Sequence, residues 1–157
     1  MKVSVVAVGR PGKLLGSAIA EYERRAARYW NFEAVEVREE KAARRTPEDV
    51  RRAETSRLLE RVPAHVELVP LTRSGERWSS AELARYLGEL TLRARTGVAF
   101  LIGGARGLSG EALERADRLL ALSAFTLPHE LARLVLAEQL YRAGTIVRRE
   151  PYHKASE

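Results

Sequence analysis

The sequence contains no cysteine, which excludes disulfide bridges, a thiolate nucleophile and zinc sites built on cysteine. Side-chain amides are almost absent, since Asn31 and Gln139 are the only ones. Lysine is also scarce, because 27 basic residues include only Lys2, Lys13, Lys41 and Lys154. This bias fits a protein adapted to high temperature, although a GC-rich genome would produce much the same composition.

Long apolar runs are missing as well. No stretch approaches the roughly 20 residues that a membrane-spanning helix needs, and the first residues lack the pattern of a signal peptide. We therefore expect a cytoplasmic protein without a membrane partner. The net charge of +6 suggests an anionic partner, nucleic acid first, although a basic surface can also be inert. The length of 157 residues suits one hydrophobic core, so we expect a single domain over 1–157.

Apolar patterning predicts strands that alternate with helices. Thr46 before Pro47 is a typical helix start, and 72–77 is interpreted as a turn. The order favours an α/β domain with a mostly parallel sheet flanked by helices, whose ligands bind beyond the carboxyl ends of the strands. The expected strands are 3–8, 32–39, 65–71, 98–102 and 122–127, and the expected helices are 13–30, 47–61, 81–92, 111–120 and 130–147.

Two glycine loops follow expected strands. The first, GRPGKL at 9–14, fails as a nucleotide-triphosphate loop because its glycines are too close and Leu14 replaces the required Ser or Thr. The second is LIGGARGLSG at 101–110, where Gly103 and Gly104 would let the backbone approach a ligand closely. A plain strand-to-helix turn is the alternative for this second loop.

The stretch LSAFTLPHELAR, 122–133, places a histidine at a helix start. Pro128 keeps the preceding residue extended, so the helix must begin at this point. His129 then lies at the positive end of the helix dipole, which favours a neutral imidazole that can accept a proton. A histidine that merely caps or packs is the alternative.

The last helix and the tail carry further polar groups. Glu138 and Arg142 are four residues apart and can pair along one side of the helix. In the tail, basic residues surround Tyr152, an arrangement that suits single-stranded RNA, with charges on phosphates and a ring on a base. A surface ion pair and a solvated tail are the alternatives.

Together these segments resemble a known family. IGGARGLS and LSAFTLPHELARLVLAEQLYRAGTIVRREPYHK closely resemble the rRNA large-subunit methyltransferase H family, as do the opening KVSVVAVGR and the EYERR at 21–25. The resemblance covers essentially the whole chain. It implies a SPOUT-type α/β knot, with a trefoil knot near the C-terminus, in a homodimer. It also implies methyl transfer from S-adenosylmethionine to N3 of a pseudouridine in a 23S rRNA stem-loop of the ribosome, chemistry that needs no metal.

The resemblance also implies the site residues by matching position. The S-adenosylmethionine pocket would comprise Leu71, Gly103, Gly104, Ser123, Ala124, Phe125, Thr126, Leu127 and Pro128. Phe125 departs from the aliphatic residue usual in the family, so we expect altered packing there with binding retained. Candidate proton acceptors are His129 and His153, while Arg142, oriented by Glu138, would stabilise the developing anion. The expected RNA contacts are Arg133, Tyr152, His153 and Lys154.

Two alternative functions remain open at this point. A SPOUT methyltransferase could act on transfer RNA or on uridine in place of pseudouridine. A basic protein without catalytic activity could instead bind the ribosome through its surface alone.

Overall fold

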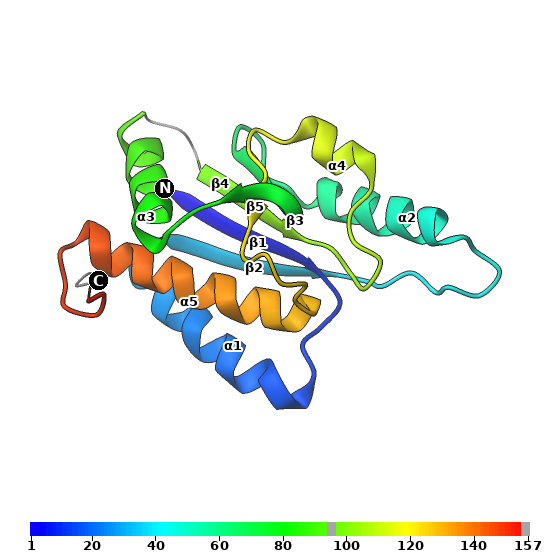
Figure 1. The fold of residues 1–157 in the computed structure, drawn as a ribbon, viewed down its shortest axis with the longest axis horizontal. Helices are drawn as coiled ribbons and strands as arrows, with labels where there is room; N and C mark the ends of the chain where they lie inside the picture. The colour runs from blue at the N-terminus through cyan, green and yellow to red at the C-terminus, as the bar shows by residue number, and fades with distance from the viewer. Residues whose placement is uncertain (94–96, 155–157) are drawn as a thin grey trace.

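The computed structural model describes residues 1–93 and 97–154 and contains one five-stranded sheet in the order β2-β1-β4-β3-β5 (Figure 1). Every strand pairing in this sheet is parallel, which confirms the expected α/β class. The strands are β1 Lys2–Val8, β2 Asn31–Val37, β3 Glu67–Arg77, β4 Gly97–Ile102 and β5 Leu120–Ala121. The helices are α1 Lys13–Ala26, α2 Pro47–Glu60, α3 Ser80–Leu92, α4 Gly110–Arg115 and α5 His129–Val147.

Helices cover both faces of the sheet. On one face α1 and α5 run side by side with α3 next to α5, and on the other face lie α2 and α4 (Figure 1). The first face buries a core that includes Phe100, Leu87 and Leu136. The second face buries a core that includes Leu101 and Leu58. Because β1 and β4 are central strands covered on both sides, their sequences are continuous apolar runs.

Two helix starts follow the local chemistry that the sequence predicts. Thr46 Oγ1 accepts a hydrogen bond from Asp49 N at 3.1 Å, the Asp49 carboxylate accepts one from Thr46 N, and Pro47 is the first helical residue of α2. Ser79 caps α3 in the same reciprocal way with Glu82. Capping of this kind fixes where a helix begins, so both starts could be read from sequence.

The prediction was wrong in two segments, 72–77 and 116–127, whereas the helix and the strand expected between them are present. Residues 72–77 are not a turn, because β3 continues to Arg77 and pairs with β5. The fifth strand lies at 120–121, not 122–127, and α4 ends at Arg115. Gly75 permits this close pairing, since a Cβ there would lie 2.7 Å from the backbone of Leu119.

The parallel sheet separates the two ends of the molecule. The first turn of α5 lies beside the loops that follow the strands, whereas the chain after α5 lies near the strand beginnings, at the end of the fold where the N-terminus lies (Figure 1). Among the helices in the described part of the chain, none is both long and apolar enough to cross a membrane. The trefoil knot implied by the resemblance stays a prediction.

Candidate functional site

A cavity of about 570 Å³ lies at the carboxyl end of β4, beside the middle of β3. Its size falls in the range typical of small-molecule sites. Three segments that are distant in sequence form it: the middle of β3, the glycine loop after β4 and the start of α5. The lining residues are Leu71, Thr72, Arg73, Ser74, Ile102, Gly103, Gly104, Ala105, Arg106, Gly107, Leu108, Leu113, Thr126, Leu127, His129 and Ala132.

A smaller cavity of about 100 Å³ shares Leu71, Arg73 and Leu127 with the larger one. Ser123 and Phe125 also line the smaller cavity, and the Phe125 side chain is 80% exposed. Seven of the nine residues assigned to the cofactor pocket by resemblance therefore line one cavity or the other. The two that line neither are Ala124 and Pro128.

The glycine loop after β4 closes on itself. Gly107 N donates to Gly104 O at 3.0 Å, and Gly107 has a φ of +79°, a conformation that favours glycine. A Cβ on Gly103 would lie 2.8 Å from the Gly107 carbonyl carbon. Glycine is required at these positions because a side chain would prevent the loop from folding tightly at the cavity wall.

A buried carboxyl group lies against this loop at Gly104. Glu54 of α2 is 4% exposed, and a Cβ on Gly104 would lie 3.0 Å from Glu54 Oε1. Glu54 Oε2 accepts a hydrogen bond from Glu40 N at 3.1 Å, while no described atom donates to Oε1. Burial raises the pKa of the Glu54 carboxyl, and the Glu40 N–H opposes that rise only in part.

A second cluster of polar and aromatic groups lies at the far end of α5. Arg142 donates to Glu138 Oε1 from Nη2 at 2.6 Å, which confirms the predicted pair. Its guanidinium carbon lies 4.8 Å from the centre of the Tyr152 ring, and its Nη1 lies 3.4 Å from His153 Nδ1. The Tyr141 ring packs against Tyr152 with the two centres 4.5 Å apart.

The protonation of this tail cluster follows from its contacts. The hydrogen bond to Glu138 raises the pKa of Arg142, so the guanidinium stays charged. Burial first, and the hydrogen bond to Glu138 second, raise the pKa of Tyr152 to about 12. Because a guanidinium only donates, a hydrogen bond between Arg142 Nη1 and His153 Nδ1, which lie 3.4 Å apart, requires Nδ1 to be the acceptor.

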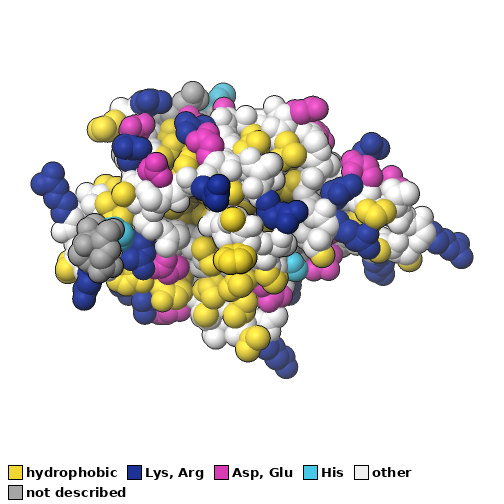
Figure 2. All heavy atoms as spheres, viewed as in Figure 1, with side chains coloured by type: hydrophobic (Ala, Val, Ile, Leu, Met, Phe, Trp, Pro, Cys, Tyr) yellow, Lys and Arg dark blue, Asp and Glu magenta, His cyan; other side chains and the backbone are white. Residues whose placement is uncertain are grey.

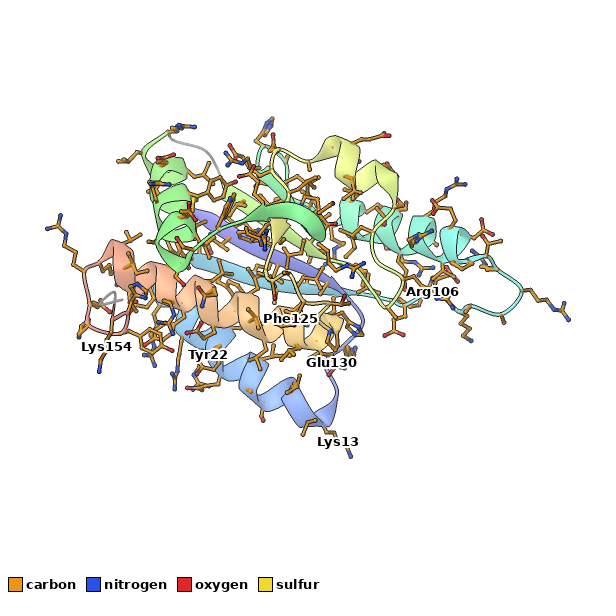
Figure 3. The ribbon with its side chains drawn as sticks, viewed as in Figure 1. Lys13, Tyr22, Arg106, Phe125, Glu130 and Lys154 are labelled. Carbon is orange, nitrogen blue, oxygen red and sulfur yellow. The ribbon has the colours of Figure 1, made fainter. Side chains whose placement is uncertain are left out.

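The two clusters do not meet within one chain. His129 and Arg142 are thirteen positions apart on α5, which separates them by roughly 20 Å along the helix. Figure 3 shows the same separation, with Glu130 near one end of α5 and Lys154 beyond the other. The residues predicted for catalysis therefore fall into two groups, with His129 at the cavity and Glu138, Arg142 and His153 at the tail.

Arg133 needs a correction as an RNA-binding residue. Its side chain is 8% exposed and pairs with Glu23 of α1 at 2.7 Å and with Glu36 of β2 at 3.6 Å. A buried guanidinium between two carboxylates is not presented to RNA, and breaking such a pair is costly. Its place in the sequence, among apolar residues of α5, fits this structural role.

Two groups were not predicted from the sequence: Arg73, which lines the cavity, and Glu54, which lies behind Gly104. Arg73 lines both cavities and donates from Nη1 to Thr126 Oγ1 at 2.7 Å, but it lies in the segment interpreted as a turn. Glu54 had a readable signal, since Val50, Glu54 and Leu58 share one buried helix face at a spacing of four. Within 1–93 and 97–154, no cluster of three or more potential metal ligands is found.

The sequence of this chain is similar to a protein family and to named proteins. Residues 1–153 match the family model described as "Predicted SPOUT methyltransferase". A protein of Gemmatimonas aurantiaca named ribosomal RNA large subunit methyltransferase H is 49% identical over 155 residues, covering 98% of this chain and 100% of that protein. Proteins of the same name from Syntrophotalea carbinolica and Rubrobacter xylanophilus are 43% and 46% identical, covering 98% and 97% of this chain and 99% and 98% of their own lengths.

Proposed function

This chain belongs to the SPOUT methyltransferase family, and from that premise we propose that it transfers a methyl group to N3 of a pseudouridine in 23S rRNA. The names of its relatives support RNA of the large ribosomal subunit as the substrate. The observation that carries the proposal is the cavity at the end of β4 and beside the middle of β3, formed by the segments that the resemblance assigns to a methyl donor. A ribosomal substrate implies a cytoplasmic protein.

The cavity residues fit S-adenosylmethionine. Leu71, Ile102 and Leu127 provide apolar walls for an adenine ring, and the Gly104 to Gly107 loop exposes backbone groups for the ribose. When bound, this cofactor supplies a methyl group on a positively charged sulfur. The protein must then hold the target nitrogen in line and remove its proton, so positioning and acid–base catalysis are the tasks left to the chain.

We assign those tasks to the two clusters separately. His129 lines the cavity and would accept the N3 proton as the new N–C bond forms. His153 would form a hydrogen bond through Nε2 to the base or its phosphate, and Tyr152 would stack on the base. Arg142, oriented by Glu138, would stabilise negative charge on the base, and exposed Lys154 would contact phosphate.

Two copies of the chain would unite these groups. Figure 2 shows hydrophobic side chains gathered over α1 and the first turns of α5. Leu14 is 89% exposed there, and Leu131 and Leu134 are only half-buried. A two-fold axis through this patch would pair the α5 helices in opposite directions and bring the tail of one copy to the cavity of the other. We therefore propose a homodimer with composite sites.

Methyl transfer to a synthetic 23S stem-loop tests the proposed activity. Labelled S-adenosylmethionine is supplied with the loop containing pseudouridine and, as the matched control, with the same loop containing uridine. We expect methylation of the pseudouridine loop alone, located at N3 by mass spectrometry of the nucleosides. Preference for uridine or for transfer RNA would overturn the substrate, and a lack of cofactor binding at millimolar concentration would favour a protein that only binds ribosomes.

A further inference from the structure

One charged side chain lines both cavities and makes no ion pair with a described residue that would give it a structural role. Arg73 lies on β3, lines both cavities and is exposed. Its Nη1 donates to Thr126 Oγ1 at 2.7 Å, and it forms no ion pair with any described carboxylate. A guanidinium fixed by one hydroxyl and left without a counter-charge is suited to bind an anion.

The residues around Arg73 also favour binding of an anion. Among the described residues that line the two cavities, the charged side chains are Arg73 and Arg106, and none is an aspartate or a glutamate. Arg106 belongs to the loop after β4 and also lines the larger cavity (Figure 3). The cavity therefore has positive charge from two separate segments of the chain, and either arginine would attract an anionic group of a ligand.

We infer that Arg73 binds the carboxylate of the methionine part of S-adenosylmethionine. This inference rests on the proposed function, because it concerns how the cofactor lies in the cavity. The carboxylate is the only anionic group of that cofactor, whose ammonium and sulfonium groups are both cations. Guanidinium and carboxylate match in geometry and can form two parallel hydrogen bonds.

The contact with Thr126 leaves the right atoms free. Nη1 is engaged by the hydroxyl, while Nε and Nη2 remain available as a side-on pair of donors. Thr126 belongs to the loop 122–128, which also forms the cavity wall, so the hydroxyl holds the guanidinium toward the cavity. A phosphate of the RNA is the competing anion.

Calorimetry with two ligands tests the inference without measuring activity. S-adenosylmethionine and its decarboxylated form differ only in the carboxylate. We expect Arg73→Gln to weaken binding of S-adenosylmethionine about tenfold, as for a charged hydrogen bond near solvent, and to leave the decarboxylated ligand within about twofold. Arg73→Lys keeps the charge and should recover part of the lost affinity. Arg77→Gln, on the same strand but outside both cavities, should change neither affinity.

The outcomes separate the inference from the function on which it rests. An equal loss for both ligands, or no loss for either, would overturn the role of Arg73 while leaving the methyltransferase proposal intact. Unchanged cofactor affinities combined with weaker binding of the stem-loop would assign Arg73 to RNA phosphate and also overturn it. If neither ligand bound the unmodified protein, the proposed function itself would fail.

Discussion

The Tyr152 hydroxyl donates a hydrogen bond to Glu138 Oε1 at 3.0 Å, which ties the C-terminal tail to the middle of α5. The same carboxylate oxygen accepts two hydrogen bonds from Arg142. Because the pKa of Tyr152 is raised to about 12, the phenol keeps its proton throughout the usual assay range. The tail is therefore held by a carboxylate whose Oε1 accepts from both Tyr152 and Arg142, while its Oε2 accepts from Gln139 Nε2.

Glu138→Gln should disturb this arrangement without unfolding the protein. The amide keeps one acceptor oxygen but loses the charge that holds Arg142. We expect this change to weaken the contact between the tail and α5 by about 1–2 kcal/mol. We expect turnover on the stem-loop to fall roughly tenfold while cofactor affinity stays within twofold, measured by single-turnover kinetics and calorimetry. Tyr152→Phe is the matched control, since it removes one hydroxyl and keeps the ring. It should cost less than Glu138→Gln, and an equal or larger cost would contradict the central role of the carboxylate.

His153→Ala should reduce turnover by about tenfold or more and leave cofactor affinity nearly unchanged, because the tail is assigned to the RNA base and no described tail residue lines the cofactor cavity. Kinetics and calorimetry on the purified variant measure the two quantities. A collapse of cofactor affinity would instead assign the tail to the cofactor pocket.

Gly104→Val should strongly weaken cofactor binding. A Cβ at Gly104 would lie 3.0 Å from Glu54 Oε1 and 3.2 Å from Val8 Cγ1, so the added side chain displaces the loop. We expect at least a tenfold loss of affinity for S-adenosylmethionine by calorimetry. Gly88→Ala is the control, because a Cβ at Gly88 meets nothing within 4 Å.

Mixing the Gly104→Val and His153→Ala proteins tests the composite site. In a homodimer with shared sites, a mixed dimer retains one intact cavity facing one intact tail. After subunit exchange the mixture should be more active than either variant alone. Activity no higher than the sum of the separate variants would place both groups in one chain and contradict the proposed arrangement.

Much of the fold was predictable because its signals are local. The apolar runs of β1 and β4, the cap at Thr46 and the proline before His129 each specify structure within a few residues. The pairing of β3 with β5 was not predictable in this way. It depends on residues 72–77 meeting residues 119–121, which lie more than forty positions away in the sequence.

In the candidate site, too, some features follow from the local sequence and others only from contacts between distant segments. The residues of the cavity could be assigned by matching position, but Arg133 could be understood only from its partners on α1 and β2. Arg73 was hidden by the wrong interpretation of its segment as a turn. Sequence patterns locate groups on elements, whereas the partner of a charged group depends on how distant elements pack.

Glu54→Gln should make the stability of the protein less sensitive to pH. Burial raises the pKa of Glu54 in the folded protein above its ordinary value of about 4.3. The folded state therefore binds this proton more tightly than the unfolded state does. The stability that the protonated carboxyl contributes is complete below that ordinary value and is lost as the pH rises through the raised pKa.

Glutamine is neutral at every pH, so its benefit should grow with pH. We expect the variant to exceed the unmodified protein in free energy of unfolding by about 1–2 kcal/mol at pH 8 and by less at pH 5, measured by urea titration. Glu60→Gln, an exposed position on the same helix, is the matched control and should show no such difference. The same gain at both pH values would mean that packing, and not ionisation, limits this site. A loss at pH 8 would mean that the charged carboxylate is stabilised by its surroundings, because the unpartnered Oε1 would then have a donor that Gln cannot replace.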